Sequence, residues 1–349
     1  MSLTVLDPGP YSLLVDAGRP RSRALGVPLG GAADRAAVAL GNALVGNPPD
    51  AVALELTLAG PTLRAEDRTA AVVFGANFSV SVGGRVVSAG TTFTLDAGDT
   101  LRIGGTPDGV RGYLCVPGGF DSPVILGSRS ALDPLKTGDV LRCEPSAMRG
   151  RSLGFVRLPQ GHLSPLRPGD PALLPPPGRG EGGGGGRLGL ADTPHPHPPP
   201  QGGRGSEGSG KLSFVLLRAV DGPQRDWFPA DAFFDTPYTV TPAGNRMGVR
   251  LAGEPLARRP GELVSEAVAP GAVQVTNDGL PVVLGVDGQT IGGYPKVAHV
   301  VRADLDRLAQ LRPGTVVRFR RVTWEEAELA ANERAAAVYE WLTRLAVGY

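Results

Sequence analysis

The run GAVQVTNDGLPVVLGVDG, residues 271–288, indicates the fold class most directly. It contains short, apolar, β-branched segments bounded by Gly, Pro, Asn or Asp, a pattern that is typical of β-strands. The same pattern occurs in the runs YSLLVDAG (residues 11–18) and TAAVVFGANFSVSVGG (residues 69–84). The 349 residues also include 51 glycines and 34 prolines, well above average usage. We therefore expect a mostly β protein of many short strands with a few helices.

Three helices are expected from their composition and capping signals. The first begins at the N-cap residue Asp34 and ends near residue 45, and the second spans residues 304–311. The third spans residues 324–345, a stretch rich in Ala, Glu, Leu and Arg. Thr323 and Glu326 form a capping box at its start.

The middle of the chain differs from both flanks. Residues 168–210 are rich in Gly and Pro and nearly devoid of apolar side chains, so little offsets the entropy of ordering them. We expect a disordered linker or long surface loop there, between one β unit over residues 1–167 and a second over residues 211–349. His195 and His197 lie in this segment, but two imidazoles without a third ligand do not predict a metal site.

A weak internal similarity favours two related units. Residues 26–31 match residues 248–253 at four of six positions, and residues 98–103 resemble residues 314–319. The pattern Gly-Asp-x-Leu-Arg of residues 98–102 also recurs at residues 138–142, and such a turn followed by a strand is common. Duplication and coincidence are both compatible with these matches.

Charge and composition exclude several functional classes. The 35 Lys and Arg residues nearly balance 34 Asp and Glu residues, and no basic stripe appears, so we expect no nucleic-acid partner. No apolar run approaches the roughly 20 residues that span a bilayer. The first residues lack the basic and apolar regions of a signal peptide. Cys115 and Cys143 are too few for a disulfide framework, and we expect a cytoplasmic protein.

The segment DGQTIGGYPK, residues 287–296, is the strongest candidate for chemistry. Adjacent glycines let the backbone approach a ligand and expose amide donors, amide and hydroxyl side chains give directional hydrogen bonds, and the lysine adds charge. Such a set suits a carboxylate, carbamoyl or phosphate group. The alternative is a hairpin loop with a solvated lysine. The residues concerned are Gln289, Thr290, Gly292, Gly293, Tyr294 and Lys296.

Two charged residues elsewhere have two interpretations each. Arg246, at a turn, either clamps an anion with its guanidinium or pairs with Glu254 or Glu266. Glu55 interrupts an apolar segment. It is either an acid of raised pKa or a residue on the exposed face of an edge strand, and we favour the exposed strand.

Two turns are candidate anion sites. Gly30-Gly31 precedes the expected helix at Asp34, a geometry that gathers amides toward an anion, although a plain loop-to-helix junction is favoured. Ser128-Arg129-Ser130 places a guanidinium between two hydroxyls at a turn, where either phosphate binding or a structural role is expected. Neither a Walker loop nor a nucleophile elbow is present.

Together these segments resemble the carboxyltransferase-domain family, which includes the C-type subunits of 5-oxoprolinases and the second chain of allophanate hydrolase or urea amidolyase. The resemblance covers nearly everything outside the linker, in the right order. The segments that carry it are GVPLGGAADRAAVALGNALVGNPPDAVALELTLAGPTL (26–63), RGYLCVPGGFDSPVILGSRS (111–130), GPQRDWF (222–228), NRMGVRLAG (245–253), SEAVAPGAVQV (265–275) and GQTIGGYPKVAHVVRADLDRLAQLRPGTVVRF (288–319).

The resemblance implies two cyclophilin-like β-barrel units and a ligand cleft. It also implies a smaller cyclophilin-like partner subunit, a third subunit that hydrolyses a lactam, and ATP with Mg²⁺ to drive 5-oxoproline to glutamate. Biotin would be the cofactor only if the chain transfers a carboxyl group, as in urea amidolyase.

Under this resemblance the candidate residues take roles. Lys296 and Arg246 would neutralise phosphate or substrate charge, and Gln289 and Thr290 would orient the substrate. Asp287 or Asp34 would hold metal or a proton. The remaining candidate binding groups are Gly30, Gly31, Ser128, Arg129, Ser130, Gly292, Gly293 and Tyr294.

The chain also departs from the family pattern. Gly30 stands where a serine is usual, Gly288 replaces an arginine, and the Gly-rich loop after Ser130 is shortened. These three changes remove groups that could bind an anion. An alternative is therefore a catalytically diverged subunit that binds and regulates a partner.

Overall fold

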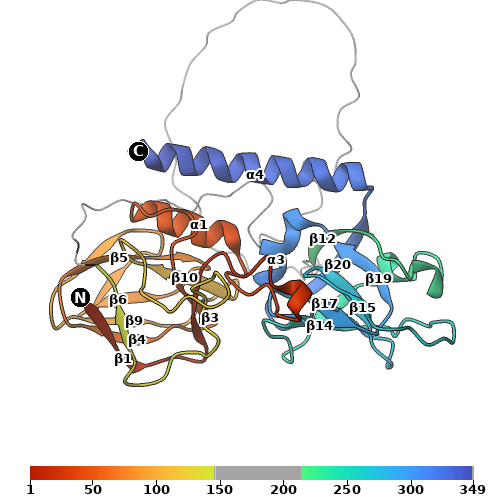
Figure 1. Ribbon diagram of the computed structural model, residues 1–349, viewed down its shortest axis with the longest axis horizontal. Helices are drawn as coiled ribbons and strands as arrows, with labels where there is room; N and C mark the ends of the chain where they lie inside the picture. Colours follow the sequence, from red (N-terminus) through yellow and green to blue (C-terminus); the bar gives the residue numbers. More distant parts are fainter. Residues whose placement is uncertain (145, 147–213, 348–349) are drawn as a thin grey trace, which may run out of the picture.

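The computed structural model describes residues 1–144, 146 and 214–347. Two β units lie side by side, and the long helix α4 (Trp324–Ala346) runs across both of them (Figure 1). The expected linker at residues 168–210, with His195 and His197, lies outside the described residues. The exact bounds of the two units therefore stay a prediction.

The first unit consists of two facing sheets. One has six strands in the order β11-β1-β4-β9-β6-β7, and the other has five in the order β2-β3-β10-β5-β8. The six are β1 (Ser2–Asp7), β4 (Thr62–Ala65), β6 (Val80–Val82), β7 (Arg85–Val87), β9 (Thr100–Ile103) and β11 (Val140–Arg142). The five are β2 (Ser12–Val15), β3 (Ala53–Thr57), β5 (Thr69–Gly75), β8 (Phe93–Leu95) and β10 (Arg111–Cys115).

The five-stranded sheet is buried on both faces. One face packs on the six-stranded sheet through residues such as Leu54 and Leu56. The opposite face lies under α1 (Arg35–Leu44), where Ala53 and Tyr113 join the helix in a second core. A sheet covered on both sides needs apolar side chains at successive positions, which explains the nearly continuous apolar strands here.

The second unit is a closed barrel with the strand order β12-β19-β16-β17-β14-β13-β20. All neighbouring strands for which pairing is described are antiparallel except β12 and β20, which run parallel. The bounds are β12 (Phe214–Asp221), β13 (Tyr238–Val240), β14 (Gly248–Ala252), β16 (Ala272–Val275), β17 (Pro281–Leu284), β19 (Lys296–Val300) and β20 (Val316–Arg321). Valine, leucine and aromatic side chains fill the barrel, among them Phe233, Tyr238 and Phe319.

Short elements complete the second unit. A two-stranded sheet pairs β15 (Glu266–Ala267) with β18 (Ile291–Gly292). The helices are α2 (Ala232–Asp235) and α3 (Leu305–Ala309), and there are 3₁₀ turns η1 (Arg23–Leu25, in the first unit), η3 (Arg225–Trp227) and η4 (Arg302–Asp304). Figure 1 shows α3 at the boundary between the units.

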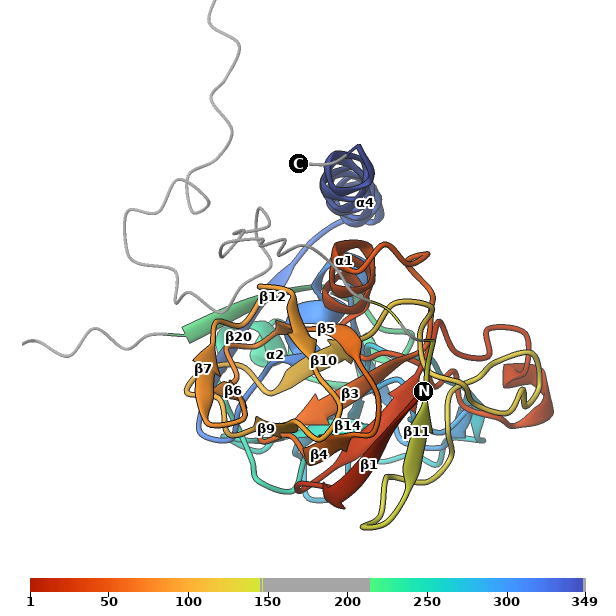
Figure 2. The same ribbon diagram turned by 90° about the vertical axis from the view of Figure 1, so that its left-hand side faces the viewer.

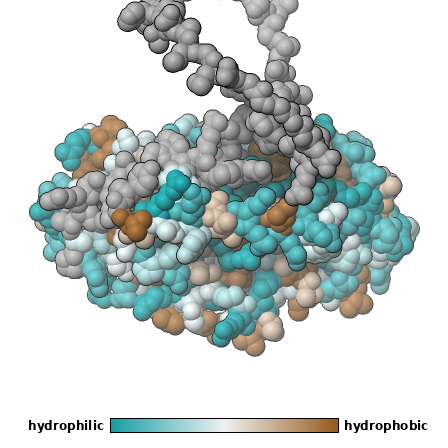
Figure 3. Space-filling view, turned by 90° about the horizontal axis from the view of Figure 1, so that it is seen from above, coloured by the Kyte–Doolittle hydropathy of each residue, from teal (hydrophilic) through white to brown (hydrophobic). Residues whose placement is uncertain are grey.

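Helix α4 ties the two units together. Leu345 packs on α1 in the first unit, and Ala330 packs on Val220 and Val301 in the second. Figure 2, viewed from the first unit, shows α4 above α1 and α1 above the sheets. Seen from the side of α4, the described surface is mostly hydrophilic, with apolar residues in separate patches (Figure 3). Within the described ranges, no helix is long and apolar enough to cross a membrane.

Several expectations are confirmed. The protein is mostly β with four helices in the described residues, and the expected helices appear as α1, α3 and α4, with Thr323 and Glu326 forming the capping box. Of the internal similarities, residues 98–103 and 314–319 both lead into strands, β9 and β20. Residues 26–31, however, form a loop whereas residues 248–252 form β14, so that pair does not occupy equivalent structure.

Candidate functional site

Glu55 lies at the centre of the contact between the two units. It sits on β3, an inner strand between β2 and β10, and on the face opposite to Leu54 and Leu56. Its carboxylate accepts hydrogen bonds from the Ala33 amide and the Tyr113 hydroxyl, at 2.9 Å each. The preference for an exposed edge strand is therefore wrong. The strand is central, and α1 with the second unit covers the face that the sequence pattern assigns to solvent.

One guanidinium from each unit meets this carboxylate. Arg111 Nε lies 3.3 Å from Glu55 Oε1, and Arg246 Nη1 donates to the same oxygen. The exposed fractions of the three side chains are 1% for Glu55, 7% for Arg246 and 9% for Arg111, so the charges interact largely out of water. Burial by itself raises the pKa of Glu55, but Arg246 and Arg111 outweigh it and hold the pKa below its usual value.

Arg246 also connects this carboxylate to the loop after β17. Its Nε lies 2.6 Å from Asp287 Oδ2 and its Nη2 lies 3.0 Å from Asp287 Oδ1, a bidentate pair. The same Nη2 donates to the Gly31 carbonyl at 2.7 Å. The expected alternative partners, Glu254 and Glu266, are thus not the ones that Arg246 contacts. The side chain binds anions, but both belong to the chain itself.

Several backbone amides at the start of α1 also have partners within the protein. Asp34 caps the helix by accepting from the Ala37 amide at 3.0 Å. The Asp34 amide donates to the Tyr113 hydroxyl at 2.8 Å, and the Arg35 amide donates to Asp306 at 2.9 Å. The Gly30, Asp34, Arg35 and Ala37 amides at this turn and helix start therefore already have partners within the protein.

Gln310 inserts from the end of α3 into the first unit. Its Oε1 accepts from the Val110 and Arg111 amides at 2.9 Å each, and its Nε2 donates to Asp34 Oδ2 at 2.8 Å and to the Arg111 carbonyl at 3.0 Å. Burial, and next the nearby Asp306 carboxylate, raise the pKa of Asp34 to about 7. We use the name "Glu55 network" for Glu55, Arg111, Arg246, Asp287, Tyr113, Asp34 and Gln310.

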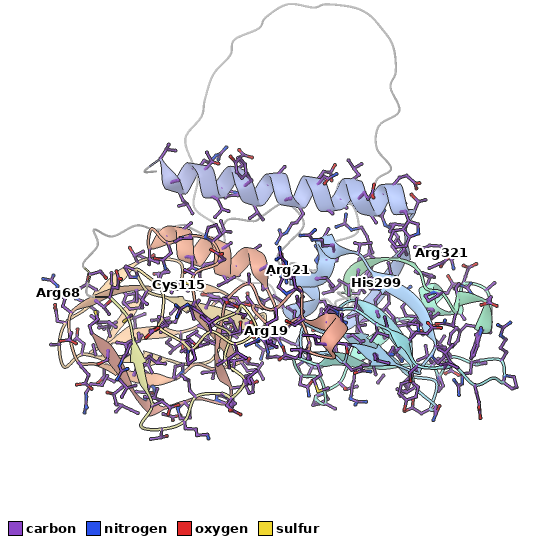
Figure 4. The ribbon with its side chains drawn as sticks, viewed as in Figure 1. Arg19, Arg21, Arg68, Cys115, His299 and Arg321 are labelled. Carbon is purple, nitrogen blue, oxygen red and sulfur yellow. The ribbon has the colours of Figure 1, made fainter. Side chains whose placement is uncertain are left out.

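Gly30 and Gly31 border this network. Both have positive φ, 63° and 75°, which favours glycine. The Gly30 amide donates to the Val286 carbonyl at 2.9 Å, and a Cβ at Gly31 would lie 2.6 Å from the Gly18 amide nitrogen. Arg19, which Figure 4 shows near the boundary between the units, lies beside Gly30. The turn thus lets two backbone segments approach closely.

The Ser128-Arg129-Ser130 turn lies in the first unit, around Asp16. Both serine hydroxyls donate to Asp16 Oδ1 at 2.6 Å, and the Arg129 amide donates to Asp16 Oδ2 at 2.6 Å. Burial raises the pKa of Asp16, but the hydrogen bonds from Ser128 and Ser130 outweigh it, so the net pKa is lowered. The Arg129 side chain contacts Asp121 at 3.1 Å. The two hydroxyls that the sequence suggests for phosphate binding thus donate to a carboxylate of the protein itself.

A second polar group, which we call the Lys296 cluster, lies on the second unit. It consists of Gln224, Glu266, Gln274, Gln289 and Lys296. Gln274 and Lys296 are neighbours across β16 and β19. Val273 and Val275 belong to the barrel core, so Gln274 between them faces the other side of the strand, toward the β15–β18 sheet.

Each member of the Lys296 cluster contacts another member. Lys296 Nζ lies 2.7 Å from Glu266 Oε2, and Gln224 Nε2 lies 3.3 Å from both oxygens of that carboxylate. Gln289 Nε2 donates to Gln274 Oε1 at 3.0 Å. The hydrogen bond from Lys296 lowers the pKa of Glu266.

This cluster keeps unused hydrogen-bonding capacity. Lys296 is 4% exposed, and its ammonium carries three donors with a single contact, to Glu266, among the described residues. Gln274 Nε2 is buried and has no partner in the described part of the chain. A Cβ at Gly292 would collide with that amide, so the glycine at this position leaves room beside it.

The other residues of the 287–296 segment lie around this cluster. Gly293 approaches the Ser265 hydroxyl, from which a Cβ would be 3.3 Å away. Thr290 is buried, and its carbonyl accepts from the Val268 amide at 2.9 Å. Tyr294 is 39% exposed. The functional roles of these residues stay predictions.

The candidates therefore fall into three places rather than one. Arg246, Asp287, Asp34 and the Gly30-Gly31 turn meet between the units, Lys296 and Gln289 meet on the second unit, and the 128–130 turn lies in the first. Sequence reasoning missed several partners of these residues. Tyr113 and Gln274 were signalled only by polarity at a single position in an apolar strand, whereas Asp16, Gln224 and Gln310 lie outside the strands. The partners missed are Arg111, Tyr113, Gln310, Asp16, Gln224 and Gln274.

A metal centre is not evident in the described ranges. Among residues 1–144, 146 and 214–347, no three His, Cys, Asp or Glu side chains are grouped so as to hold an ion. Cys115 and Cys143 are both free thiols, and burial raises the pKa of each, to about 11 for Cys143. Neither thiol is positioned as an activated nucleophile.

Comparison with known proteins gives consistent matches. Residues 25–165 and 185–321 match the model of a family described as carboxyltransferase domain, subdomain A and B. The chain is 31% identical to the C-type subunit of 5-oxoprolinase from Escherichia coli over 338 residues, 95% of each protein. It is 29% identical to urea amidolyase of Lachancea kluyveri over 357 residues, which cover 96% of this chain and 18% of that protein.

Solved structures give the same relationship. The crystal structure of the Kluyveromyces lactis urea carboxylase matches with a TM-score of 0.73 and 26% identity, over 97% of this chain and 29% of that one. The chain thus spans nearly the whole length of the bacterial protein but less than a third of either urea enzyme.

Proposed function

The chain belongs to the carboxyltransferase-domain family, and from this premise we propose that it is the C-type subunit of an ATP-dependent amide hydrolase of the 5-oxoprolinase kind. The observation that carries the proposal is the match to the C-type subunit of the Escherichia coli 5-oxoprolinase across 95% of both proteins. The proposed reaction opens 5-oxoproline to glutamate in the cytoplasm.

The chemistry of this reaction defines what the site must supply. The lactam carbonyl oxygen attacks the γ-phosphorus of ATP, and ADP leaves. A first water adds to the activated carbon, and the ring C–N bond breaks as nitrogen takes a proton, which leaves an acyl phosphate. A second water adds to that acyl carbon and releases phosphate, giving the free carboxylate. Positioning and neutralisation of negative charge are the main catalytic requirements.

The Lys296 cluster supports this proposal best. Its ammonium has donors to spare, and the unpartnered Gln274 amide and the room at Gly292 lie next to it. In the proposal Lys296 neutralises phosphate or substrate charge, and Gln289 and Gln274 orient the lactam. Thr290, Gly292, Gly293 and Tyr294 belong to the same segment, residues 287–296, and would contribute further hydrogen-bonding groups.

The Glu55 network has a positioning role in this proposal. Arg246 and Asp287 neutralise each other and Asp34 is hydrogen-bonded to Gln310, so we propose that these residues position the loop instead of acting on the substrate. The donors around Lys296 suit the oxygens of ATP phosphates. Mg²⁺ bound through phosphates keeps much of its water shell, so ATP would bring the ion without a dedicated protein cage.

Partners are part of the proposal. A smaller cyclophilin-like subunit and a lactam-hydrolysing subunit would complete the enzyme. The test co-expresses the chain with both and measures 5-oxoproline-dependent ATP hydrolysis in the purified complex. We expect turnover that requires all three chains. Absence of turnover in a complex shown to be assembled would reject the assignment.

A regulatory role is the second candidate, and one observation favours it. The hydroxyls of Ser128 and Ser130 are taken by Asp16, and both anionic partners of Arg246 are internal. A binding subunit would form the complex with the smaller partner but would not bind ATP, which calorimetry measures. The urea relatives support carboxyl transfer from biotin as a further alternative, for which transfer from a carboxylated biotin carrier is the assay.

A further inference from the structure

A cavity of about 340 Å³ lies between the two units. Tyr11, Thr57 and Leu58 of the first unit line it, together with Thr241, Val249 and other residues of the second. Asn245 and Met247 lie on its wall and are exposed, so a molecule can enter from solvent. None of the five residues of the Lys296 cluster lines it. The cavity is therefore a separate candidate site.

The walls are largely apolar. Val110, Val240, Val249, Leu311 and Pro313 contribute to them. Leu58 is unusual because it has a φ of 65° and a side chain that is 38% exposed. A leucine in the left-handed region is uncommon, and such conformations cluster at ligand sites. This combination is typical of small-molecule pockets, in which a few polar groups interrupt an apolar lining.

Two polar groups on the wall have unused hydrogen-bonding capacity. The hydroxyl oxygens of Thr57 and Thr241 are buried, and neither has a hydrogen-bond partner in the described part of the chain. One comes from each unit. A buried hydroxyl without a partner needs an explanation, and a ligand that accepts a hydrogen bond provides one. Burial raises the pKa of Tyr11, so its phenol also stays a neutral donor.

The charged groups around the cavity are already paired. Arg111 and Arg246 line it, and their charges are balanced by Glu55 behind them and by Asp287. A charged ligand would lose hydration without meeting a free counter-ion, whereas a neutral ligand avoids that cost.

We propose that the inter-unit cavity binds a small neutral molecule with an apolar body and a carbonyl group, held by hydroxyls from both units. The carbonyl accepts from Thr57 and Thr241, and the apolar body lies against Leu58 and Val249. Because both units line the cavity, the bound ligand stabilises the contact between them. The proposal does not depend on the reaction that the protein catalyses.

The experiment titrates the full-length chain with ε-caprolactam and follows binding by saturation-transfer NMR. Cyclohexanecarboxylate serves as a charged probe of similar size. We expect caprolactam to bind and the carboxylate not to. Thr57→Val and Thr241→Val should each weaken caprolactam binding about fivefold, the effect of one lost neutral hydrogen bond.

Matched controls separate the explanations. Thr239→Val removes an exposed hydroxyl two residues from Thr241 and should leave binding unchanged. Thr57→Val and Thr241→Val should unfold at the same or a higher temperature than the wild type, because their hydroxyls have no partner to lose. Unchanged affinity in both valine variants, tighter binding of the carboxylate, or a lowered unfolding temperature would overturn the proposal.

Discussion

The Glu55 network and the Lys296 cluster are both polar groups against apolar sheets, but they differ in how completely they are satisfied. In the Glu55 network two guanidinium groups face two carboxylates, and the Gln310 amide has partners on both its atoms. In the Lys296 cluster one buried ammonium faces a carboxylate that is 42% exposed, and the Gln274 amide nitrogen has no described partner.

This difference indicates a division of labour. A buried charge whose partners are all internal contributes mainly to holding its surroundings in place, because a ligand would have to break existing contacts. Groups with spare donors next to a glycine can accept a ligand without that cost. We therefore infer that the Glu55 network holds the units together and that the Lys296 cluster meets the substrate.

The largest effect on stability is expected for Glu55→Gln. The change keeps the shape but leaves Arg111 and Arg246 without their shared counter-ion, which destabilises by about 3–5 kcal/mol for a buried pair. Denaturant unfolding measures the loss. Glu66→Gln removes an exposed partner of Arg64 and should leave the stability nearly unchanged. Equal, small losses in both variants would contradict a structural role for the network.

Gln310→Ala should have the next largest effect and lower the free energy of unfolding by about 3 kcal/mol. It removes at once the described side-chain partner of the buried Val110 and Arg111 amides and of Asp34 Oδ2. Gln274→Ala is the matching change in the other region. Because the Gln274 Nε2 atom has no described partner, its removal should cost less than Gln310→Ala by the same unfolding assay. The reverse order would show that unsatisfied groups do not mark the ligand site.

The pH dependence of stability gives the next effect. The pKa of Asp34 is raised to about 7, whereas an unfolded aspartate titrates near its ordinary value of 3.8. Between these values the folded state holds the proton that the unfolded state has lost, so this contribution to stability disappears as pH rises toward 7. The free energy of unfolding of Asp34→Asn, measured relative to that of the wild type, should therefore increase by about 2 kcal/mol as the pH rises from 5 to 8.

Urea unfolding of both proteins at several pH values checks this sign. Asp306 and Tyr113 also face Asp34, so the comparison with Asp34→Asn isolates the group itself. A stability difference that stays constant from pH 5 to pH 8 would contradict the raised pKa.

The smallest effect on stability is expected for Lys296→Met. The methionine fills similar space, and the Glu266 carboxylate that loses its partner is partly exposed and can be hydrated. Thermal unfolding should shift by no more than the equivalent of about 1 kcal/mol. A loss as large as that of Glu55→Gln would assign Lys296 to the structure and not to the substrate.

The sequence predicts secondary structure better than it predicts partners. The capping box at Thr323 and the β-branched runs are local signals, and the structure confirms them. The expectation for Glu55 fails because other elements supply its partners, among them Tyr113 of β10 and Arg246 of the second unit, both far away in sequence. Lys296 and Gly292 stand out in the sequence, whereas Gln274 does not, because a single polar residue in an apolar strand also fits an exposed face.

The most direct test of the division of labour compares Lys296→Met with the wild type in the assembled complex, measuring 5-oxoproline-dependent ATP hydrolysis and unfolding temperature on the same samples. The expected result is a loss of turnover by at least about a hundredfold, the scale seen when one charge-stabilising group is removed, with an unfolding temperature close to that of the wild type. Full turnover in a folded, assembled Lys296→Met complex would contradict it.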